Sequence, residues 1–281
     1  MAIALVPIAL WYLLVAALLV GIAVALVLDP TWESVLAAGF LVVGGPVALW
    51  EHLQRSESVA LRAARAEVIA PAEQGELYTL VARVAAQADL APPRIAIARS
   101  SAPNAFSVGL TEDRAVVAFT TELLRLDLAP AELEAVVAHE LAHVANRDGV
   151  VMTFVSAPAL VGSRIWHADD FRAKVFFVLL YWPFFFIGLL AMWALSRYRE
   201  YVADRGAALI TGAPEQLMSA LQKIAGRPAR GDLRGGLAVR ALCIVGRQKG
   251  WRRFELFSDH PPLHKRLERL AQLSRELGEA A

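Results

Sequence analysis

Two histidines and a glutamate near the middle of the chain have the residue types and spacing of a metal site. His139, Glu140 and His143 lie in the sequence HELAH, within a stretch that is expected to be helical. Helix residues four positions apart lie on one face, about one turn from each other, so both imidazoles would face the same way. This geometry suits a tetrahedral zinc ion with the glutamate as a general base. The alternative is two surface histidines on a polar helix face.

A catalytic zinc ion needs a third protein ligand and an open position for water. The downstream sequence SRYREYVAD, residues 196–204, has Glu200 and Asp204 four positions apart on a second expected helix, again on one face. We predict that Glu200 is the third ligand and that Asp204 accepts the remaining N–H of a ligating histidine. The alternative is a charged helix face beside a membrane, with ion pairs between residues four apart.

Helices and short strands are expected to position these residues. Pro130 suits the first turn of the HELAH helix, which is expected to continue to Asn146, with Gly149 as a stop. Apolar residues at helical spacing predict three further helices, at residues 77–84, 214–225 and 263–273. Period-two alternation and short β-type runs predict three strands, at residues 94–99, 106–110 and 115–119, of which the last two form a hairpin.

Four long apolar segments indicate a membrane protein. The chain is 57% apolar with a mean hydropathy of +0.47, against about 45–50% apolar in soluble domains. Uncharged runs predict transmembrane helices at residues 2–28, 34–50 and 175–195. Residues 150–166 are a marginal span, because their helix would reach about 25 Å against a hydrocarbon core of about 30 Å. The segments divide the chain into a membrane hairpin at 1–55, half of a catalytic domain at 56–149, a second hairpin at 150–196 and the other catalytic half at 197–281.

Basic residues beside the apolar segments predict their orientation. Arg55, Arg62 and Arg65 follow the second segment and three more arginines follow the fourth, whereas the loop at residues 29–33 has neither Lys nor Arg. Both catalytic halves are therefore expected to face the cytoplasm from the inner membrane of the cell. The net charge of +1 does not support a nucleic-acid partner, and the single cysteine excludes a disulfide framework.

Taken in order, these motifs resemble those of HtpX-type integral-membrane zinc proteases, relatives of the prenyl-protein-processing membrane metalloproteases. The resemblance covers nearly the whole chain. It rests on the two pairs of apolar segments and on four short sequences: PNAF at 103–106, HELAH at 139–143, RYREYVAD at 197–204, and HPP at 260–262 with Arg266. It implies zinc held by His139, His143 and Glu200, and proteolysis of membrane proteins in quality control. It also implies an edge strand near Asn104 that pairs with an extended substrate.

We therefore expect an α-rich α+β fold, a membrane-anchored zincin with about four transmembrane helices and a small sheet in a cytoplasmic catalytic domain. The expected function is hydrolysis of peptide bonds in misfolded or membrane proteins as part of a stress response, with one zinc ion per chain and Glu140 as the catalytic base. His260 is expected to stabilise the tetrahedral oxyanion, and Arg266 to support the ligands. Two alternatives are a prenyl-protein-type processing peptidase and a non-catalytic membrane zinc-binding adaptor, in which His260 or His264 would be a fourth ligand.

Overall fold

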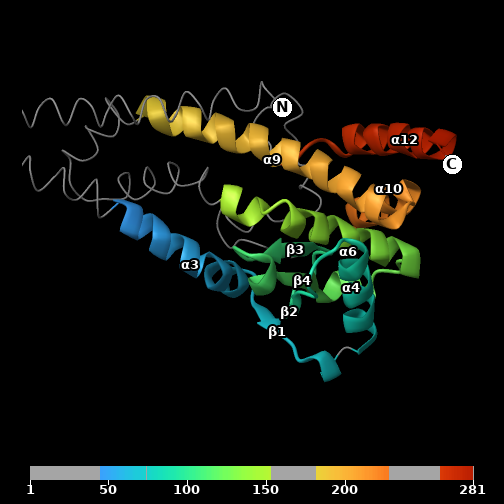
Figure 1. The fold of residues 1–281 in the computed structure, drawn as a ribbon, viewed down its shortest axis with the longest axis horizontal. Helices are drawn as coiled ribbons and strands as arrows, with labels where there is room; N and C mark the ends of the chain where they lie inside the picture. Colours follow the sequence, from blue (N-terminus) through green and yellow to red (C-terminus); the bar gives the residue numbers. More distant parts are fainter. Residues whose placement is uncertain (1–44, 74, 153–181, 228–259, 281) are drawn as a thin grey trace, which may run out of the picture. The chain divides into compact units, whose positions relative to one another are not determined.

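A computed structural model describes residues 45–73, 75–152, 182–227 and 260–280 (Figure 1). The chain divides into two compact units, Met1–Arg55 with Met152–Leu195, and Ser56–Val151 with Ser196–Ala281. The second unit contains all the candidate site residues. Most of the four segments that the sequence predicts to span a membrane lies outside the described residues. Within the described ranges, no helix has both the length and the apolar composition that crossing a membrane requires.

A four-stranded sheet lies in the second unit. Its strands are β1 (Ala66–Val68), β2 (Arg94–Ala98), β3 (Ala105–Val108) and β4 (Val116–Thr120), in the spatial order β1-β2-β4-β3. Strands β2 and β4 are parallel, and the other two pairs are antiparallel. The predicted hairpin is confirmed, since Ala105 of β3 pairs with Phe119 of β4. Strand β3 is therefore an edge strand, and the sequence did not predict the three-residue β1 on the opposite edge.

The helices of the described residues are α3 (Gly45–Ala63), α4 (Gly75–Gln87), α5 (Thr121–Arg125), α6 (Pro130–Ala145), α9 (Trp182–Thr211), α10 (Pro214–Gly226) and α12 (Leu263–Ala280), with short 3₁₀ turns η2 (Pro71–Glu73) and η3 (Glu112–Arg114). The helix predicted before the three strands is confirmed as α4, and those predicted after the strands at 130–146, 214–225 and 263–273 are confirmed as α6, α10 and α12. Gly149 is not the stop of α6: Arg147, with φ of 54°, ends that helix, and a new helical turn begins at Asp148. The left-handed backbone of Arg147 interrupts the helix there.

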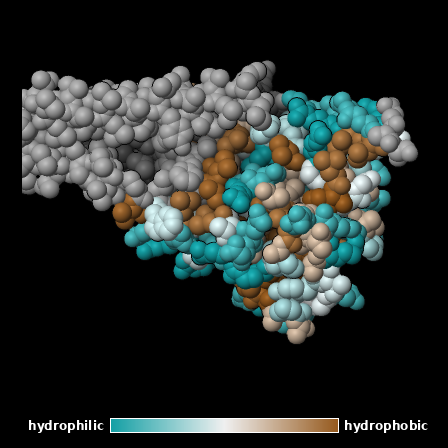
Figure 2. Space-filling view, in the orientation of Figure 1, coloured by the Kyte–Doolittle hydropathy of each residue, from teal (hydrophilic) through white to brown (hydrophobic). Residues whose placement is uncertain are grey.

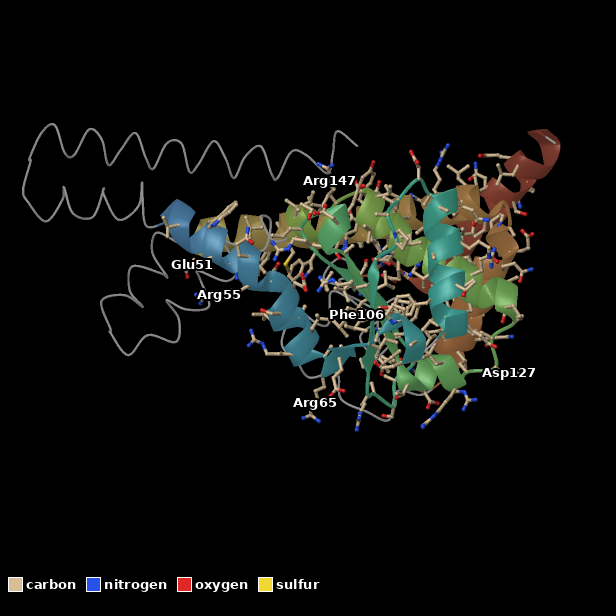
Figure 3. All side chains as sticks on the ribbon, turned by 60° about the horizontal axis from the view of Figure 1, so that its bottom comes forward. Glu51, Arg55, Arg65, Phe106, Asp127 and Arg147 are labelled. Carbon is tan, nitrogen blue, oxygen red and sulfur yellow. The ribbon has the colours of Figure 1, made fainter. Side chains whose placement is uncertain are left out.

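Strand β4 is buried on both faces and separates two apolar clusters. Val117 and Phe119 belong to the larger cluster, with side chains from α4, α6, α10 and α12. Val116 and Ala118 belong to the smaller one, with α3 and Phe106 of β3. Figure 3 shows Phe106 among packed side chains, and its exposed fraction is 1%. The uninterrupted apolar run of β4 follows from this burial on both sides.

Helix α6 is enclosed by the rest of the second unit along more than two turns, because each residue from 135 to 143 is buried. Its chemistry-bearing residues therefore lie in the protein interior rather than on a wet helix face. Polar side chains in such a position need partners, since an unpaired buried polar group costs about 1–3 kcal/mol.

The start of α6 is joined to α10 through one buried glutamate. Glu132 accepts hydrogen bonds from the Ala129 N–H at 2.7 Å and from the hydroxyl of Ser219, and pairs with Lys223 Nζ at 2.7 Å. Burial raises the pKa of Glu132, but the donors from Lys223, Ser219 and Ala129 outweigh burial and lower it. The carboxylate thus caps the helix and links it to α10.

Exposed apolar side chains occur on the two helices that extend from the second unit into the first. Val47 and Trp50 on α3 and Phe186 and Leu190 on α9 are all exposed, Trp50 by 64%. Figure 2 shows hydrophobic residues among hydrophilic ones on the face that it draws. All four lie in segments that the sequence predicts to be transmembrane.

Candidate metal centre

Helix α6 directs both histidines of the HELAH sequence toward the same interior point. Their ring centroids are 4.7 Å apart in an edge-to-face arrangement, as expected for residues four positions apart on a helix. His139 is fully buried and His143 is 7% exposed. Glu140, between them in sequence, is 2% exposed.

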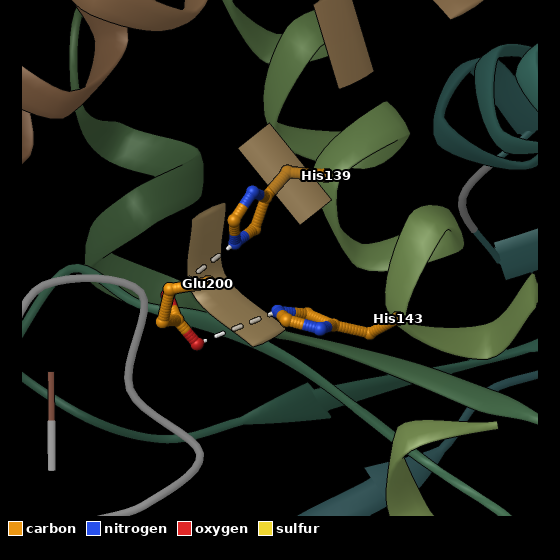
Figure 4. A group of neighbouring side chains, drawn as sticks. All are labelled: His139, His143 and Glu200. Carbon is orange, nitrogen blue, oxygen red and sulfur yellow. Dashed lines mark ion pairs between the residues drawn. The ribbon is translucent and has the colours of Figure 1, made fainter. Parts of the chain in front are cut away.

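Helix α9 brings Glu200 to the same point from a distant part of the sequence. Glu200 Oε2 lies 3.7 Å from His139 Nε2, and Glu200 Oε1 lies 3.6 Å from His143 Nε2 (Figure 4). One ligand atom from each of the three residues lies within 4.8 Å of the others, the one such group in the part of the chain that the structure describes. All three side chains are buried.

The donor set and its spacing fit a zinc ion. Two imidazoles and a carboxylate are a ligand set of catalytic zinc sites, and bonds of about 2.0–2.1 Å would put tetrahedral ligand atoms about 3.3 Å apart. The observed 3.6 and 3.7 Å are slightly wider. His139 Nε2 and Glu200 Oε2 are also buried without a hydrogen-bond partner. A cation between them would satisfy both atoms.

A buried aspartate and a buried arginine contact the proposed ligands. Asp204 Oδ1 lies 3.1 Å from His139 Nδ1, on the opposite side of that ring from Glu200. Arg266 of α12 donates to both carboxylate oxygens of Asp204, at 2.8 and 2.6 Å, and its Nη1 lies 3.3 Å from Glu200 Oε2. With an exposed fraction of 1%, Arg266 is a buried charge that is paired with two carboxylates.

These contacts favour a cation at the site. Burial lowers the pKa of His139, but Asp204 and Glu200 outweigh burial and raise it to about 9. Burial raises the pKa of Glu200, while His139, His260 and Arg266 bring it well below its usual range. Burial likewise raises the pKa of Asp204, and Arg266 and His139 lower it. Both carboxylates are therefore ionised at neutral pH, and they attract either a proton or a metal ion to the ring of His139.

The two C-terminal histidines have different environments. His260, just before α12, is 5% exposed, and its Nδ1 lies 3.7 Å from Glu200 Oε2. His264 is exposed on α12. Neither belongs to the group of converging ligand atoms in the described residues.

Asn104 lies immediately before the edge strand β3 and is buried. Its backbone N–H donates to the Thr120 hydroxyl at 2.8 Å, and its carbonyl accepts from the Thr120 N–H at 2.9 Å. Its backbone is therefore engaged with β4. Pairing with a substrate would use the edge of β3 that faces away from β4.

Asp148 is a site residue that the sequence reasoning missed. Its Oδ2 lies 2.6 Å from His143 Nδ1, and both side chains are buried. The available signal was an acidic residue five positions after the second histidine, just beyond the end of the helix.

The chain is similar to known proteases along most of its length. The model of peptidase family M48 matches residues 71–274. A protease HtpX homolog of Moorella thermoacetica is 40% identical over 265 residues, covering 88% of each chain. Protease HtpX homolog 1 of Streptomyces coelicolor is 39% identical and covers 95% of this chain and 91% of its own length. The crystal structure of S. mikatae Ste24p matches with a TM-score of 0.47 and 20% identity, over 93% of this chain and 63% of that one.

Proposed function

The chain belongs to peptidase family M48, together with the HtpX proteases that it resembles, and is a metalloendopeptidase. From this premise we propose that His139, His143 and Glu200 bind a catalytic zinc ion. The observation that carries the proposal is the convergence of three buried ligand atoms beside Glu140. Three protein ligands leave one tetrahedral position for water or substrate, as peptide hydrolysis requires.

Glu140 is the proposed general base. A zinc ion bound at this site would polarise the scissile carbonyl and make a water molecule more acidic. Glu140 accepts the proton of the attacking water and passes it to the nitrogen of the leaving amine. Because Glu140 is almost fully buried, it exchanges that proton with the substrate rather than with bulk solvent.

His260 is the proposed donor to the oxyanion. It is buried beside Glu200, and Pro261 and Pro262 restrict the backbone that carries it. A donor in this position stabilises negative charge as it develops on the carbonyl oxygen. The adaptor alternative requires a fourth protein ligand, and the exposure of His264 argues against that residue in this role.

The proposed substrates are misfolded or membrane polypeptides, cleaved by a multi-pass inner-membrane enzyme whose catalytic unit faces the cytoplasm. The four apolar segments, the arginines after the second and fourth of them, and the exposed apolar side chains on α3 and α9 support this proposal. A reporter fused after Ala281 tests the orientation, and activity of a periplasm-only reporter there would overturn it.

The zinc assignment is tested with the purified full-length chain, by metal analysis and by cleavage of casein. We expect about one zinc ion per chain, lost in His139→Ala. Glu140→Gln should retain zinc and lose cleavage, since Glu140 is a base and not a ligand. His264→Ala is the matched control and should retain both. A metal-free Glu140→Gln variant, or one that cleaves at the wild-type rate, would contradict the role of Glu140.

A further inference from the structure

The ring of His143 lies between two carboxylates. Its Nε2 is 3.6 Å from Glu200 Oε1, and its Nδ1 is 2.6 Å from Asp148 Oδ2. The exposed fractions of His143 and Asp148 are 7% and 8%. A contact this short between buried partners is a charge-assisted hydrogen bond, in which Nδ1–H donates to the carboxylate. Nε2 then has its lone pair directed toward the proposed metal position.

A regular helix could not make this contact. Residues five positions apart on an α-helix are about 140° apart around its axis, so Asp148 would face away from His143. The chain departs from the helix at Arg147, whose φ is 54°. The Asn146 N–H still donates to the Ala142 carbonyl, whereas the Arg147 N–H donates to Val144 and closes the turn. This left-handed residue returns Asp148 to the side of the helix that carries the ligands.

A close backbone approach holds the turn. A Cβ on Gly149 would lie 2.7 Å from the carbonyl oxygen of Gly109, just beyond the end of β3. Such a contact is closer than side-chain carbon atoms adopt, so glycine is required for the two backbones to approach this far. Arg147 also lies 3.7 Å from Glu112 in the β3–β4 connection. Asp148 therefore sits on a turn braced against the sheet.

We propose that Asp148 is the positioning residue for the second zinc ligand, His143. It selects the tautomer with the proton on Nδ1, orients the ring and increases the electron-donating strength of Nε2. It does for His143 what Asp204 does for His139, from the other side of the site. The inference rests on the proposed function, because it requires a metal ion at His139, His143 and Glu200.

A structural role for Asp148 predicts a different response to substitution. Asp148 begins the helical turn after α6, where an acidic side chain also suits the helix N-terminus. Asparagine has the same size as aspartate, and at such a position it loses only the favourable interaction of the charge with the helix dipole, a small effect on folding. It lacks the charge, however, and its NH₂ group can donate to Nδ1 and favour the wrong tautomer of the ring. Asp148→Asn therefore separates the two roles.

The test measures zinc affinity by chelator competition in the full-length chain that carries Glu140→Gln, so that the proposed catalytic base is absent during the measurement. Asp148→Asn should weaken zinc binding about 10- to 100-fold. It should also alter the visible absorption of bound Co²⁺, and the thermal unfolding of the metal-free chain should remain close to that of the parent. Asp113→Asn, at an exposed position on η3, is the matched control and should bind zinc like the parent.

A second variant leaves the carboxylate intact and moves its backbone. Gly149→Ala forces a shift against Gly109 and should also weaken zinc binding, whereas Gly75→Ala has open space around the new methyl group and should not. Unchanged zinc affinity in Asp148→Asn would overturn the inference. So would a metal-free Asp148→Asn chain that fails to fold, since the residue would then be structural. A parent chain that binds no zinc would instead overturn the proposed function.

Discussion

Adding a single methyl group to α9 at Gly206 should weaken metal binding. Gly206 lies two residues after Asp204, and a Cβ there would be 2.7 Å from Cβ of Ala142, the residue before His143 on α6. Carbon atoms in contact normally lie about 3.5–4.0 Å apart. The two helices must therefore separate by about 1 Å in Gly206→Ala. These helices carry all three proposed ligands.

A separation of about 1 Å exceeds the variation in ligand distance that a zinc site allows. Its cost in folding free energy should nevertheless be small. Ligand distances in zinc sites hold to about ±0.2 Å, so a displacement of Glu200 by about 1 Å should reduce zinc affinity at least about 10-fold. Overpacking costs about 1–3 kcal/mol, and replacing glycine by alanine within a helix returns about 1 kcal/mol. The metal-free chain should lose no more than about 2 kcal/mol of stability.

The assay is zinc competition in the Glu140→Gln background, together with thermal unfolding of the metal-free chain. Gly278→Ala, on an open face of α12, is the control and should raise stability without changing zinc affinity. The double variant Gly206→Ala with Ala142→Gly removes the clash and should restore most of the affinity. If Gly206→Ala binds zinc as tightly as the parent, the close approach of α6 and α9 does not set the ligand geometry.

Three further substitutions test other contacts. Glu132→Gln should lower the free energy of unfolding at pH 7 by about 1–3 kcal/mol. Folding lowers the pKa of Glu132. The stabilisation by its carboxylate is therefore fully present above the unfolded pKa of about 4.3, and it is lost as the pH falls through the folded pKa. Chemical unfolding at pH 7 and pH 3 checks this, and an equal difference at both would contradict it. Arg266→Ala removes the arginine partner of two buried carboxylates, Asp204 and Glu200, and should lower the free energy of unfolding by about 3–5 kcal/mol, measured in the same way. A loss below about 1 kcal/mol, as for a surface ion pair, would contradict this. His260→Ala should retain zinc and lower kcat about 10²- to 10³-fold with little change in KM, and equal losses in His264→Ala would remove the oxyanion role from His260.

Local sequence patterns predicted the elements whose signal is contained in a few neighbouring residues. The helix of His139 and His143, the β3–β4 hairpin and the shared face of Glu200 and Asp204 all follow from spacings of two or four residues. The parallel pairing of β2 with β4 and the short β1 depend on contacts between distant segments, which periodicity does not encode.

The contact between Asp148 and His143 was missed for a different reason. It depends on a left-handed backbone at an arginine, and the usual signal for such a turn is glycine or asparagine at that position. The nearby Gly149 instead suggested a helix stop. Glycine is required at position 149 because the backbone there closely approaches Gly109, forty positions earlier in the sequence. No local sequence pattern connects the two residues.

The supports of the two histidines also differ in when they can form during synthesis. His143 and Asp148 are five residues apart, so their contact can form as soon as α6 and the turn after it leave the ribosome. His139 depends on Glu200 and Asp204, and Asp204 is fixed by Arg266, which lies 62 residues further along the chain. A nascent chain therefore lacks the third proposed ligand until Glu200 has been synthesised, and lacks the arginine that fixes Asp204 until Arg266 has been synthesised. If the proposed site is correct, a ribosome-bound chain that ends before Glu200 cannot hydrolyse its unfolded neighbours, because the ligand set is still incomplete.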